Sequence, residues 1–321
     1  MVWEFILGLF LIVLLVFFSG VVVDIFEKVS RELRLNRLLL ATFLISFSTS
    51  IPELTIGLVS SFKGEPQIAL GNLIGASLAN LSWIVGGVAL FSGAISVVGD
   101  YLRKDLWMTL LLATLPFLLM VDGSLTRLDG IVLILFYLFY VKNMLLPSEK
   151  LKHSKLNKRS RVAKAVGGRF RPWMIHCFLL ALSLGALFYI SSLLVGTVIK
   201  ISSTLGVNSY WVGLMVLAFG TTVPELVLTL VAASRKDTSL VLGNILGSVV
   251  VNSTFILGLV SFVSPVVFES SVQKGVSGIF LVLVLGLFWL FTKTKRKLER
   301  WEGAVLIGFY LMFVGIQMLV V

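Results

Sequence analysis

Residues 46–54 read SFSTSIPEL, and residues 218–226 read AFGTTVPEL. A second pair of segments follows: residues 71–82 read GNLIGASLANLS, and residues 243–254 read GNILGSVVVNST. Both pairs align without a gap at one offset of 172 residues. Matched motifs at a constant offset indicate an internal repeat, so the fold is expected to consist of two related halves.

The composition around these motifs is that of a membrane protein. Of the 321 residues, 58% are hydrophobic and 13% are charged, whereas a soluble domain carries about a quarter charged residues. A soluble core cannot hide this much apolar surface, so lipid is the expected solvent. A single cysteine, Cys177, excludes an internal disulfide framework and a thiolate metal site, and two histidines leave little for imidazole-based metal chemistry.

We expect an all-α integral membrane protein with ten transmembrane helices, each near the length that crosses the hydrocarbon layer. The expected spans are 3–26, 38–62, 67–92, 105–121, 128–146, 173–199, 210–234, 239–263, 275–292 and 302–320. They group into a first five-helix repeat (1–146), a basic cytoplasmic loop (147–172) and a second five-helix repeat (173–321). The first span is too long for a signal-peptide core and carries Glu4 in place of a basic start, so it is kept as a helix.

The basic residues predict the orientation in the cell membrane. Of the 27 Lys and Arg residues, 23 fall in the loops after the first, third, fifth, seventh and ninth spans. By the positive-inside rule these loops are cytoplasmic, and both termini of the multi-pass chain are extracellular. The basic loop then acts as a topology signal that lies on anionic lipid headgroups. A net charge of +11 therefore needs no nucleic-acid partner, and the lipid bilayer is the expected one.

Five helices in each half give the second half the opposite orientation to the first. Two inverted halves are a common plan of secondary transporters, in which the substrate binds near the membrane midplane. Duplication for packing alone is the other explanation of the repeat. It gives no reason for a repeated Pro-Glu pair in the middle of a span.

Glu53 and Glu225 are the candidate binding residues. Of the 16 acidic residues, only these two lie well inside expected spans. A carboxylate inside the membrane is costly, and it is a functional hypothesis by default. The alternative is a protonated carboxyl group that donates a hydrogen bond to a neighbouring helix. Two glutamates at equivalent positions of a repeat favour the functional interpretation.

The residues around each glutamate supply further oxygen atoms. Pro52 and Pro224 have no N–H for the carbonyl groups four residues earlier, so those oxygens need another partner. From each glutamate the chain runs to the end of its helix, turns, and runs back through the next helix over a similar length. An asparagine of that next helix therefore lies at about the same depth in the membrane as the glutamate. The expected ligands beside the glutamates are the carbonyls of Ser48 and Gly220, the hydroxyls of Thr49, Ser50, Thr221 and Thr222, and the amides of Asn80 and Asn252. Such oxygens are the ligands of Ca²⁺, which takes six to eight of them.

These motifs carry a family resemblance. STSIPEL and GTTVPEL, each followed by GN-x-x-G-x-x-x-x-N, resemble the two α-repeats of the cation/Ca²⁺ exchanger superfamily. The resemblance covers nearly the whole chain. It implies a calcium antiporter in which Glu53 and Glu225 bind Ca²⁺, with no cofactor and no enzymatic activity. It also implies that the first and sixth helices slide as a gate over the rest.

Two departures from the family pattern bear on the counter-ion. Asn252 stands where similar prokaryotic Na⁺/Ca²⁺ exchangers often have Asp, and Ala76 stands where they often have Ser. Two carboxylates give the site a charge of −2, which one Ca²⁺ or two H⁺ would neutralise. We therefore expect exchange of Ca²⁺ for H⁺ by alternating access, with Na⁺/Ca²⁺ exchange on the same fold as the alternative.

Other classes of protein remain open on the sequence alone. A cation channel would need a continuous pore, whereas an inverted repeat with one midplane site favours alternating access. An antiporter for another divalent cation, such as Mg²⁺ or Mn²⁺, would also use an all-oxygen site. The two carboxylates resemble the dyad of an aspartic-type intramembrane enzyme, but no loop for cleaving a substrate is visible.

Overall fold

The structure is a computed structural model that describes residues 2–32, 44–93, 95–96, 100–145, 170–267, 271–295 and 297–320. The described residues are almost entirely helical. In the first part of the chain the helices are α1 (Val2–Glu32), α3 (Ser46–Thr49), α4 (Ile51–Phe62), α5 (Pro66–Ala79), η2 (Asn80–Ile84), α6 (Val85–Ser92), α7 (Asp100–Leu119), η3 (Met120–Asp122) and α8 (Arg127–Leu145).

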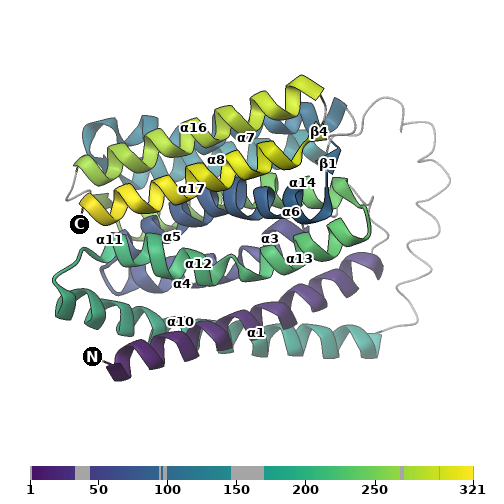
Figure 1. Cartoon of the computed structure of the whole chain (residues 1–321). Helices are drawn as coiled ribbons and strands as arrows, with labels where there is room; N and C mark the ends of the chain where they lie inside the picture. Colours follow the sequence, from purple (N-terminus) through teal and green to yellow (C-terminus); the bar gives the residue numbers. More distant parts are fainter. Residues whose placement is uncertain are drawn as a thin grey trace.

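The second part of the chain repeats this order of elements. Its helices are α10 (Phe170–Leu205), α11 (Ser209–Val212), η5 (Gly213–Leu217), α12 (Ala218–Thr221), α13 (Val223–Ser234), α14 (Thr238–Val250), η6 (Val251–Ile256), α15 (Leu257–Val263), α16 (Ser271–Lys295) and α17 (Arg300–Val320). The segments η2, η5 and η6 are π-helical, and each continues the α-helices on both sides of it. Both termini lie at the same end of the helical bundle (Figure 1).

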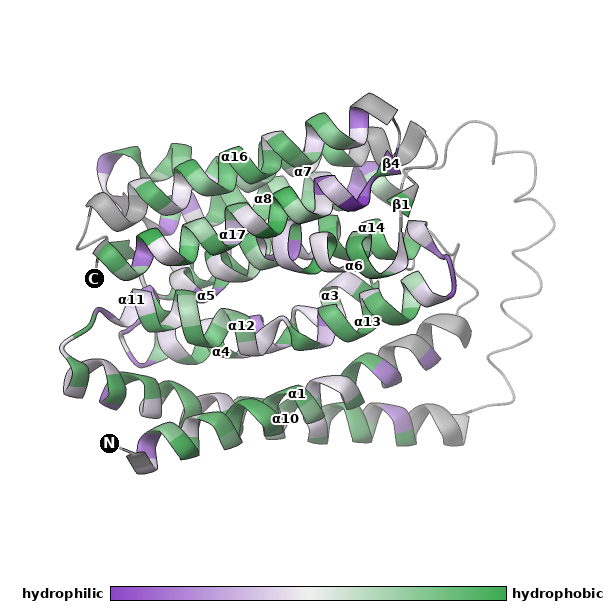
Figure 2. Ribbon diagram, in the orientation of Figure 1, coloured by the Kyte–Doolittle hydropathy of each residue, from purple (hydrophilic) through white to green (hydrophobic). Residues whose placement is uncertain are grey.

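Seven helices of the described residues are long and apolar enough to cross a membrane. They are Trp3–Ile25, Pro66–Ser92, Phe178–Leu205, Ser209–Ser234, Leu240–Val263, Gly275–Lys293 and Arg300–Leu319. Ile51–Phe62 and Leu106–Asp122 are shorter apolar helices. Residues 38–43 of the span expected at 38–62 lie outside the described residues, and so do residues 147–169 of the basic loop expected at 147–172. Figure 2 shows that apolar residues dominate the outer helices along their length.

Two helices extend beyond the spans expected from hydropathy. α1 continues to Glu32, past the expected end at residue 26, and α10 runs from Phe170 to Leu205, past both expected ends. Hydropathy detects the part of a helix that lies in hydrocarbon, whereas backbone hydrogen bonds continue the helix into the polar layer. The polar residues 27–32 therefore belong to the helix and not to a loop.

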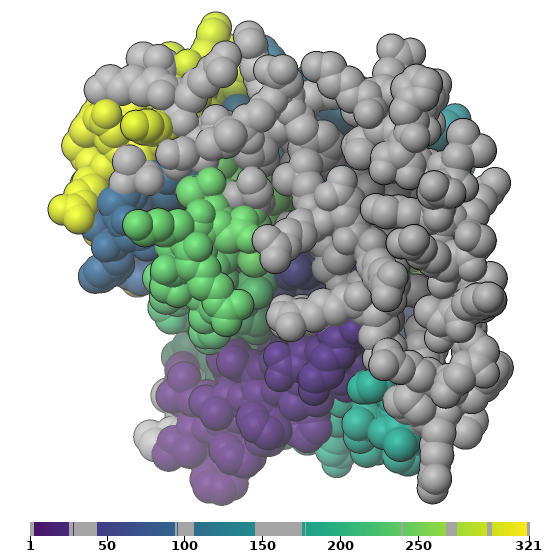
Figure 3. Space-filling model, turned by 90° about the vertical axis from the view of Figure 1, so that its right-hand side faces the viewer, coloured from purple at the N-terminus to yellow at the C-terminus, as the bar shows by residue number. Residues whose placement is uncertain are grey.

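α1 and α10 pack side by side along one edge of the molecule (Figures 1 and 3). With α4 and single residues of α5, α11 and η5 they form an apolar cluster that is distinct from the larger cluster of the bundle. Leu15 and Leu187 are fully buried in this smaller cluster. The two helices thus form a layer of their own, attached to the bundle by a second hydrophobic core.

The centre of the bundle is formed by two helical rods, Pro66–Ser92 and Leu240–Val263, which are far more buried than α1 or α10. Glycines allow the first rod to approach the helix that begins at Ser209. A Cβ atom at Gly71 would lie 2.1 Å from the carbonyl oxygen of Tyr210, and one at Gly75 would lie 2.5 Å from that of Leu214. Only a residue without a side chain fits at these crossings, as expected for small residues at helix interfaces.

The two parts of the chain also pack directly against each other. α6 packs on α17, where a Cβ at Gly86 would lie 2.6 Å from the carbonyl oxygen of Gly303. α8 packs on α15, where a Cβ at Gly130 would lie 2.6 Å from that of Gly258. Each of these close helix crossings joins one residue before the central loop to one residue after it.

Two short strand pairs also join the first part of the chain to the second, at the ends of the helices. β1 (Ile95–Ser96) pairs antiparallel with β4 (Lys297–Leu298), and β2 (Ser124–Leu125) pairs antiparallel with β3 (Val266–Val267). Each pair satisfies backbone groups where the chain leaves one helix for the next. The first and second parts of the chain are therefore interlocked by backbone hydrogen bonds as well as by helix packing.

Candidate ion-binding site

Two breaks in helices place the glutamates at helix beginnings. α3 ends at Thr49, its C-cap residue Ser50 has φ −85° and ψ 7°, and α4 follows at once with Pro52 in its first turn. α12 ends in the same way at Thr221, its C-cap residue Thr222 has φ −80° and ψ −1°, and Pro224 lies in the first turn of α13. Proline is tolerated in the first turn of a helix because its missing N–H would be unpaired there.

Glu53 and Glu225 consequently lie in the first turns of α4 and α13, where the helix dipole favours negative charge. Both side chains are fully buried. The four carboxylate oxygens have no hydrogen-bond partner among the described residues. The two carboxylates are close enough to repel each other electrostatically. A buried, unpaired carboxylate pair is expensive, so a cation or protons must compensate its charge.

Each glutamate faces a threonine from the other part of the chain. The Glu53 carboxylate lies beside the hydroxyl of Thr221, and the Glu225 carboxylate lies beside that of Thr49, without a hydrogen bond of ordinary geometry. The two glutamates and two threonines thus form one cluster that draws equally on both parts.

Asparagines hold the two threonines from across the bundle. The Thr221 hydroxyl donates to the side-chain oxygen of Asn72 at 3.2 Å, and the Thr49 hydroxyl donates to that of Asn244 at 3.3 Å. Both asparagines are fully buried, and their NH₂ groups have no partner among the described residues. Each threonine hydroxyl has one hydrogen and a second acceptor for it in the preceding turn, the carbonyl oxygen of Ser46 at 3.1 Å from Thr49 and that of Ala218 at 3.4 Å from Thr221.

Asn80 and Asn252 lie in the π-helical segments. Asn80 begins η2, which contacts α13, and Asn252 lies in η6, which contacts α4. Both side chains are fully buried, and neither amide has a hydrogen-bond partner in the described part of the chain. π-Helical turns occur often at functional sites. Each asparagine is therefore brought to the helix that carries the glutamate of the other part.

The remaining predicted ligands line the helix breaks. Ser48, Ser50, Gly220 and Thr222 are all buried. The hydroxyls of Ser48 and Thr222 donate to carbonyl oxygens of their own helices, whereas the Ser50 hydroxyl has no partner among the described residues. For Ser48 and Gly220 the expected ligand is the carbonyl oxygen, which loses its usual donor to the proline but accepts a backbone N–H at the helix cap instead.

Sequence reasoning missed Ser248. Its buried hydroxyl lies 3.3 Å from that of Thr49, so Thr49 has both Ser248 and Asn244 as neighbours. The position 172 residues earlier is Ala76, which gives Thr221 no such neighbour. Comparing the two repeats residue by residue would have revealed this asymmetry. It makes one side of the site richer in hydroxyl groups than the other.

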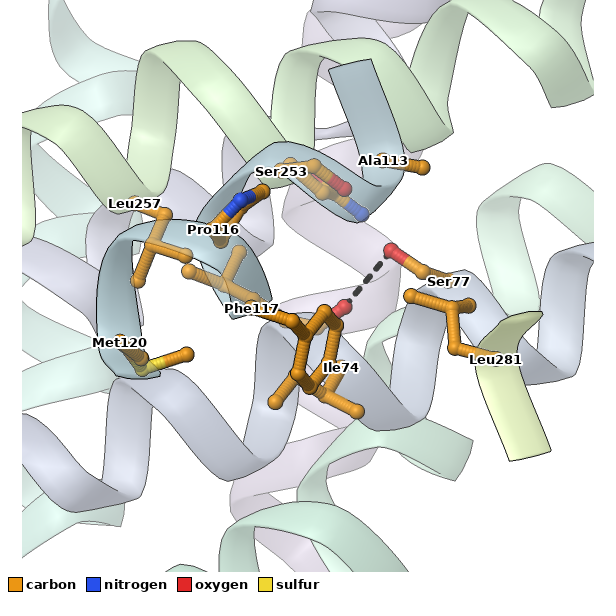
Figure 4. Close-up of a pocket in the computed structure, with 11 residues that line it drawn as sticks. Ile74, Ser77, Ala113, Pro116, Phe117, Met120, Ser253, Leu257 and Leu281 are labelled. Carbon is orange, nitrogen blue, oxygen red and sulfur yellow. Dashed lines mark hydrogen bonds between the residues drawn. The ribbon is translucent and has the colours of Figure 1, made fainter. Parts of the chain in front are cut away.

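A small pocket reaches Asn252 from the side of α7 (Figure 4). Its walls come from α5, α7, η3, η6, α15 and α16, and Pro116 inside α7 forms part of them. The only hydrogen bond drawn there runs from the Ser77 hydroxyl to the carbonyl oxygen of Leu73, at 2.8 Å. The pocket is lined mostly by apolar residues, and Asn252, Ser77 and Ser253 are the polar residues among them.

The chemistry of the cluster suits a hard cation. In the described part of the chain no three His, Cys, Asp or Glu residues come together, which leaves two carboxylates with neutral oxygens around them. Carboxylates, amides, hydroxyls and carbonyls are ligands of Ca²⁺, and they also suit Mg²⁺ and Mn²⁺. Among the described residues that were predicted as ligands, the side-chain oxygens without a hydrogen-bond partner are those of Glu53, Glu225, Asn80, Asn252 and Ser50.

Comparison with known proteins agrees with this chemistry. The chain is 26% identical over 301 residues to the putative antiporter CaxA of Alkalimonas amylolytica, which covers 91% of both chains. It is 28% identical over 332 residues to the sodium/calcium exchanger MaX1 of Methanosarcina acetivorans, which covers 89% of this chain and 90% of the relative. A further relative, 28% identical over 293 residues, is the uncharacterized membrane protein MJ0091 of Methanocaldococcus jannaschii.

Solved structures share the fold. The sodium-calcium exchanger NCX_Mj, soaked with Na⁺ and Ca²⁺ or Sr²⁺, superposes with a TM-score of 0.66 at 24% identity, over 98% of this chain and 97% of the other. The family model described as "Sodium/calcium exchanger protein" matches residues 3–146 and 175–319. Its members are multi-pass membrane antiporters, which are secondary transporters and not enzymes. The chain belongs to the sodium/calcium exchanger protein family, within the cation/Ca²⁺ exchanger superfamily.

Proposed function

We propose that this protein exports Ca²⁺ from the cell in exchange for H⁺, by alternating access at the site between Glu53 and Glu225. The observation that carries the proposal is the pair of fully buried carboxylates whose oxygens have no partner among the described residues. Hydroxyls and amides from both parts of the chain surround them. One Ca²⁺ would neutralise the pair and use oxygens that otherwise stay unsatisfied in a medium without water.

The proposed metal ligands are those predicted from the sequence: Glu53, Glu225, Asn80, Asn252, Ser48, Thr49, Ser50, Gly220, Thr221 and Thr222. They exceed the six to eight oxygens that Ca²⁺ takes at one time. The set is therefore shared between the bound states of the transport cycle. Glu53 and Glu225 provide the charge, and the neutral groups provide the coordination.

The architecture proposed for this cycle is ten transmembrane helices in two inverted halves. The halves are residues 1–146 and 173–321, joined by the basic loop 147–172. Support comes from features that recur at one offset: the helix breaks at Ser50 and Thr222, and the π-helical segments at Asn80 and Asn252. Five helices in each half reverse its orientation, and the site then falls between the halves.

The proposed motion is a sliding of α1 and α10 over the other helices. Its support is the separate apolar cluster beneath these two helices, because an apolar interface can shift without breaking many directional bonds. The Lys and Arg distribution supports the proposal that both termini lie outside the cell. Sliding would then expose the glutamate site to the outer and inner solutions in turn.

Proton coupling is favoured by the charge of the site. Two carboxylates are neutralised by one Ca²⁺ or by two H⁺, so the same oxygens can hold either cargo but not both. Asn252 adds no third carboxylate, and Ala76 adds no hydroxyl. Several bound Na⁺ ions would need more oxygen ligands than remain at the site with Asn252 in place of a carboxylate and Ala76 in place of a hydroxyl. Competition of H⁺ and Ca²⁺ for one carboxylate pair is the basis of obligatory exchange.

A specific observation also favours Na⁺ as a second candidate. The Ser248 and Thr49 hydroxyls lie 3.3 Å apart beside Asn244, which gives one side of the site a cluster of neutral oxygens suited to Na⁺. Two similar proteins, MaX1 and NCX_Mj, are named sodium/calcium exchangers. Na⁺/Ca²⁺ exchange at the same two glutamates is therefore the alternative function.

The deciding experiment measures Ca²⁺ uptake into proteoliposomes with no Na⁺ on either side. For proton exchange, an imposed pH gradient drives Ca²⁺ uphill, and adding a Na⁺ gradient has no further effect. Uptake only with a Na⁺ gradient would replace H⁺ by Na⁺ as the counter-ion. Ca²⁺ flux that needs no ion on the opposite side would indicate a channel instead. Replacing Ca²⁺ by Mg²⁺ or Mn²⁺ in the same assay identifies the transported cation.

A further inference from the structure

Two neighbouring serines of α10 make polar contacts with α4. The Ser191 hydroxyl lies 2.9 Å from that of Thr55, and both side chains are fully buried. The Thr55 hydroxyl also donates to the carbonyl oxygen of Pro52 at 3.0 Å, which uses its one hydrogen. Ser191 is therefore the donor to Thr55. One residue further on, the Lys63 ammonium donates to the carbonyl oxygen of Ser192.

The hydroxyl pair has no equivalent between α1 and α13. At the repeat offset of 172 residues, Ser191 corresponds to Ser19 and Thr55 corresponds to Val227. Ser19 is fully buried, but its hydroxyl has no hydrogen-bond partner among the described residues. Val227 is 54% exposed, whereas Thr55 is covered completely by the helices around it. The two gate helices thus sit differently on the two glutamate-bearing helices.

The lysine contact differs between the two sides as well. Lys63 corresponds to Arg235, and Ser192 corresponds to Gly20. Arg235 is exposed, and a Cβ at Gly20 would meet no atom within 4 Å. α1 is therefore not packed at this position, whereas α10 is packed beside Lys63. A Cβ at Gly196 of α10, by contrast, would lie 3.4 Å from the Lys63 ammonium.

We infer that Ser191, Thr55 and Lys63 form a latch that fixes α10 on α4 and favours this conformation over its counterpart, in which α1 lies on α13. The inference rests on the two inverted halves and the sliding gate of the proposed function. In the counterpart conformation Ser19 would meet Val227, which has no hydrogen-bonding group. A hydroxyl hydrogen bond inside a membrane then stabilises only one of the two conformations.

The position of the latch indicates which side of the membrane it closes. α4 (Ile51–Phe62) carries Glu53 in its first turn and ends just before Lys63, whose loop the Lys and Arg distribution assigns to the outside of the cell. The latched α10 therefore covers the outer route to the site. The hydrogen bond from Thr55 to Pro52 connects the latch to the turn that carries Glu53. The latch accordingly biases the resting protein towards the conformation that is closed to the outside.

The test is a distance measurement by pulsed electron paramagnetic resonance, without Ca²⁺, in lipid nanodiscs. Spin labels are attached to cysteines at Ser203 of α10 and Asp122 beyond α7, both exposed, in a Cys177→Ser background. Thr55→Val removes the acceptor with little change of shape and is expected to lower the ratio of latched to unlatched distances about three- to tenfold. Thr55→Ser keeps the hydroxyl and is the matched control, with the ratio of the parent protein.

The reciprocal variant tests the asymmetry directly. Val227→Thr gives Ser19 a partner and is expected to lower the latched fraction as well, and further in combination with Thr55→Val. A Thr55→Val ratio within twofold of the parent, a single distance in all variants, or a Val227→Thr shift towards the latched distance would overturn the latch. If Thr55→Val does not fold, Ser191→Ala carries the same expectation. Lack of Ca²⁺ uptake by the wild type counts against the proposed function alone, because the distances need no ion.

Discussion

The hydroxyl of Thr49 donates to the side-chain oxygen of Asn244 at 3.3 Å, although the two residues are 195 positions apart. The pair Thr221 and Asn72 forms the same bond in the reverse sense at 3.2 Å. Through its asparagine, each part of the chain thus holds the threonine of the other part that lies beside its own glutamate. A site built in this way requires both parts at once, and its geometry depends on how they are packed together.

The glutamates provide the first prediction. Glu53→Gln and Glu225→Gln are each expected to abolish Ca²⁺ uptake in proteoliposomes, because each removes half of the charge that compensates the cation. The isosteric amide keeps the packing, so both variants should stay folded by size-exclusion chromatography. Glu65→Gln, in the turn before α5, is the control and should transport normally. Near-normal uptake by either of the first two variants would remove that residue from the site.

The asparagine–threonine pairs provide the second prediction. Asn72→Ala should weaken the apparent Ca²⁺ affinity about fivefold, since one hydrogen bond that orients a ligand is lost. Thr221→Val should cost at least as much. In a double-mutant cycle the two effects should be strongly non-additive, because both changes remove the same bond. Additive losses would mean that Asn72 acts on the site by another route.

Close helix packing provides the third prediction. Gly303→Ala places a Cβ 2.7 Å from the carbonyl oxygen of Gly86, so the two helices must separate. We expect a loss of about 1–3 kcal/mol in the free energy of unfolding, seen as a lower melting temperature. Gly308→Ala, on the same helix but with no atom within 4 Å of the new Cβ, is the control. Equal melting temperatures for the two variants would contradict the close approach.

The orientation provides the fourth prediction. A cysteine at Ser160, in the basic loop and in a Cys177→Ser background, should react with membrane-impermeant thiol reagents only from the cytoplasmic side. A cysteine at Ser203, at the far end of α10, should react from outside. Labelling in intact cells and in inverted vesicles measures both. Reaction of the Ser160 variant in intact cells would reverse the orientation assigned from Lys and Arg.

Much of the site could be predicted because its chemistry is visible locally. Glu53 and Glu225 stand out as the only acids deep in apolar segments, and the constant offset identifies their relationship. The same offset shows that Ser248 stands opposite Ala76, but not that its hydroxyl contacts Thr49, because that contact depends on a neighbour almost 200 residues away. The π-helical turns at Asn80 and Asn252 also leave no local pattern, since they arise where packing forces an extra residue into a helix.

The helix ends were less predictable for a different reason. Hydropathy located the apolar part of α1 but not residues 27–32, since these leave the hydrocarbon while the helix continues. The contact of Ser191 with Thr55 was likewise invisible. Serine and threonine are common in membrane helices, and only the packing of α10 on α4 brings these two hydroxyls together.

The crossed strand pairs have a consequence for biosynthesis. Ile95 finds its strand partner, Leu298, only after the ribosome has made nearly the whole chain, and Leu125 must wait for Val266. The early helices therefore enter the bilayer with unpaired backbone at their ends, and the last helix to be inserted completes the assembly. A chain that stops before Lys297 leaves an open edge for quality-control proteases, whereas two separately synthesised fragments still contain every partner that the closed form needs.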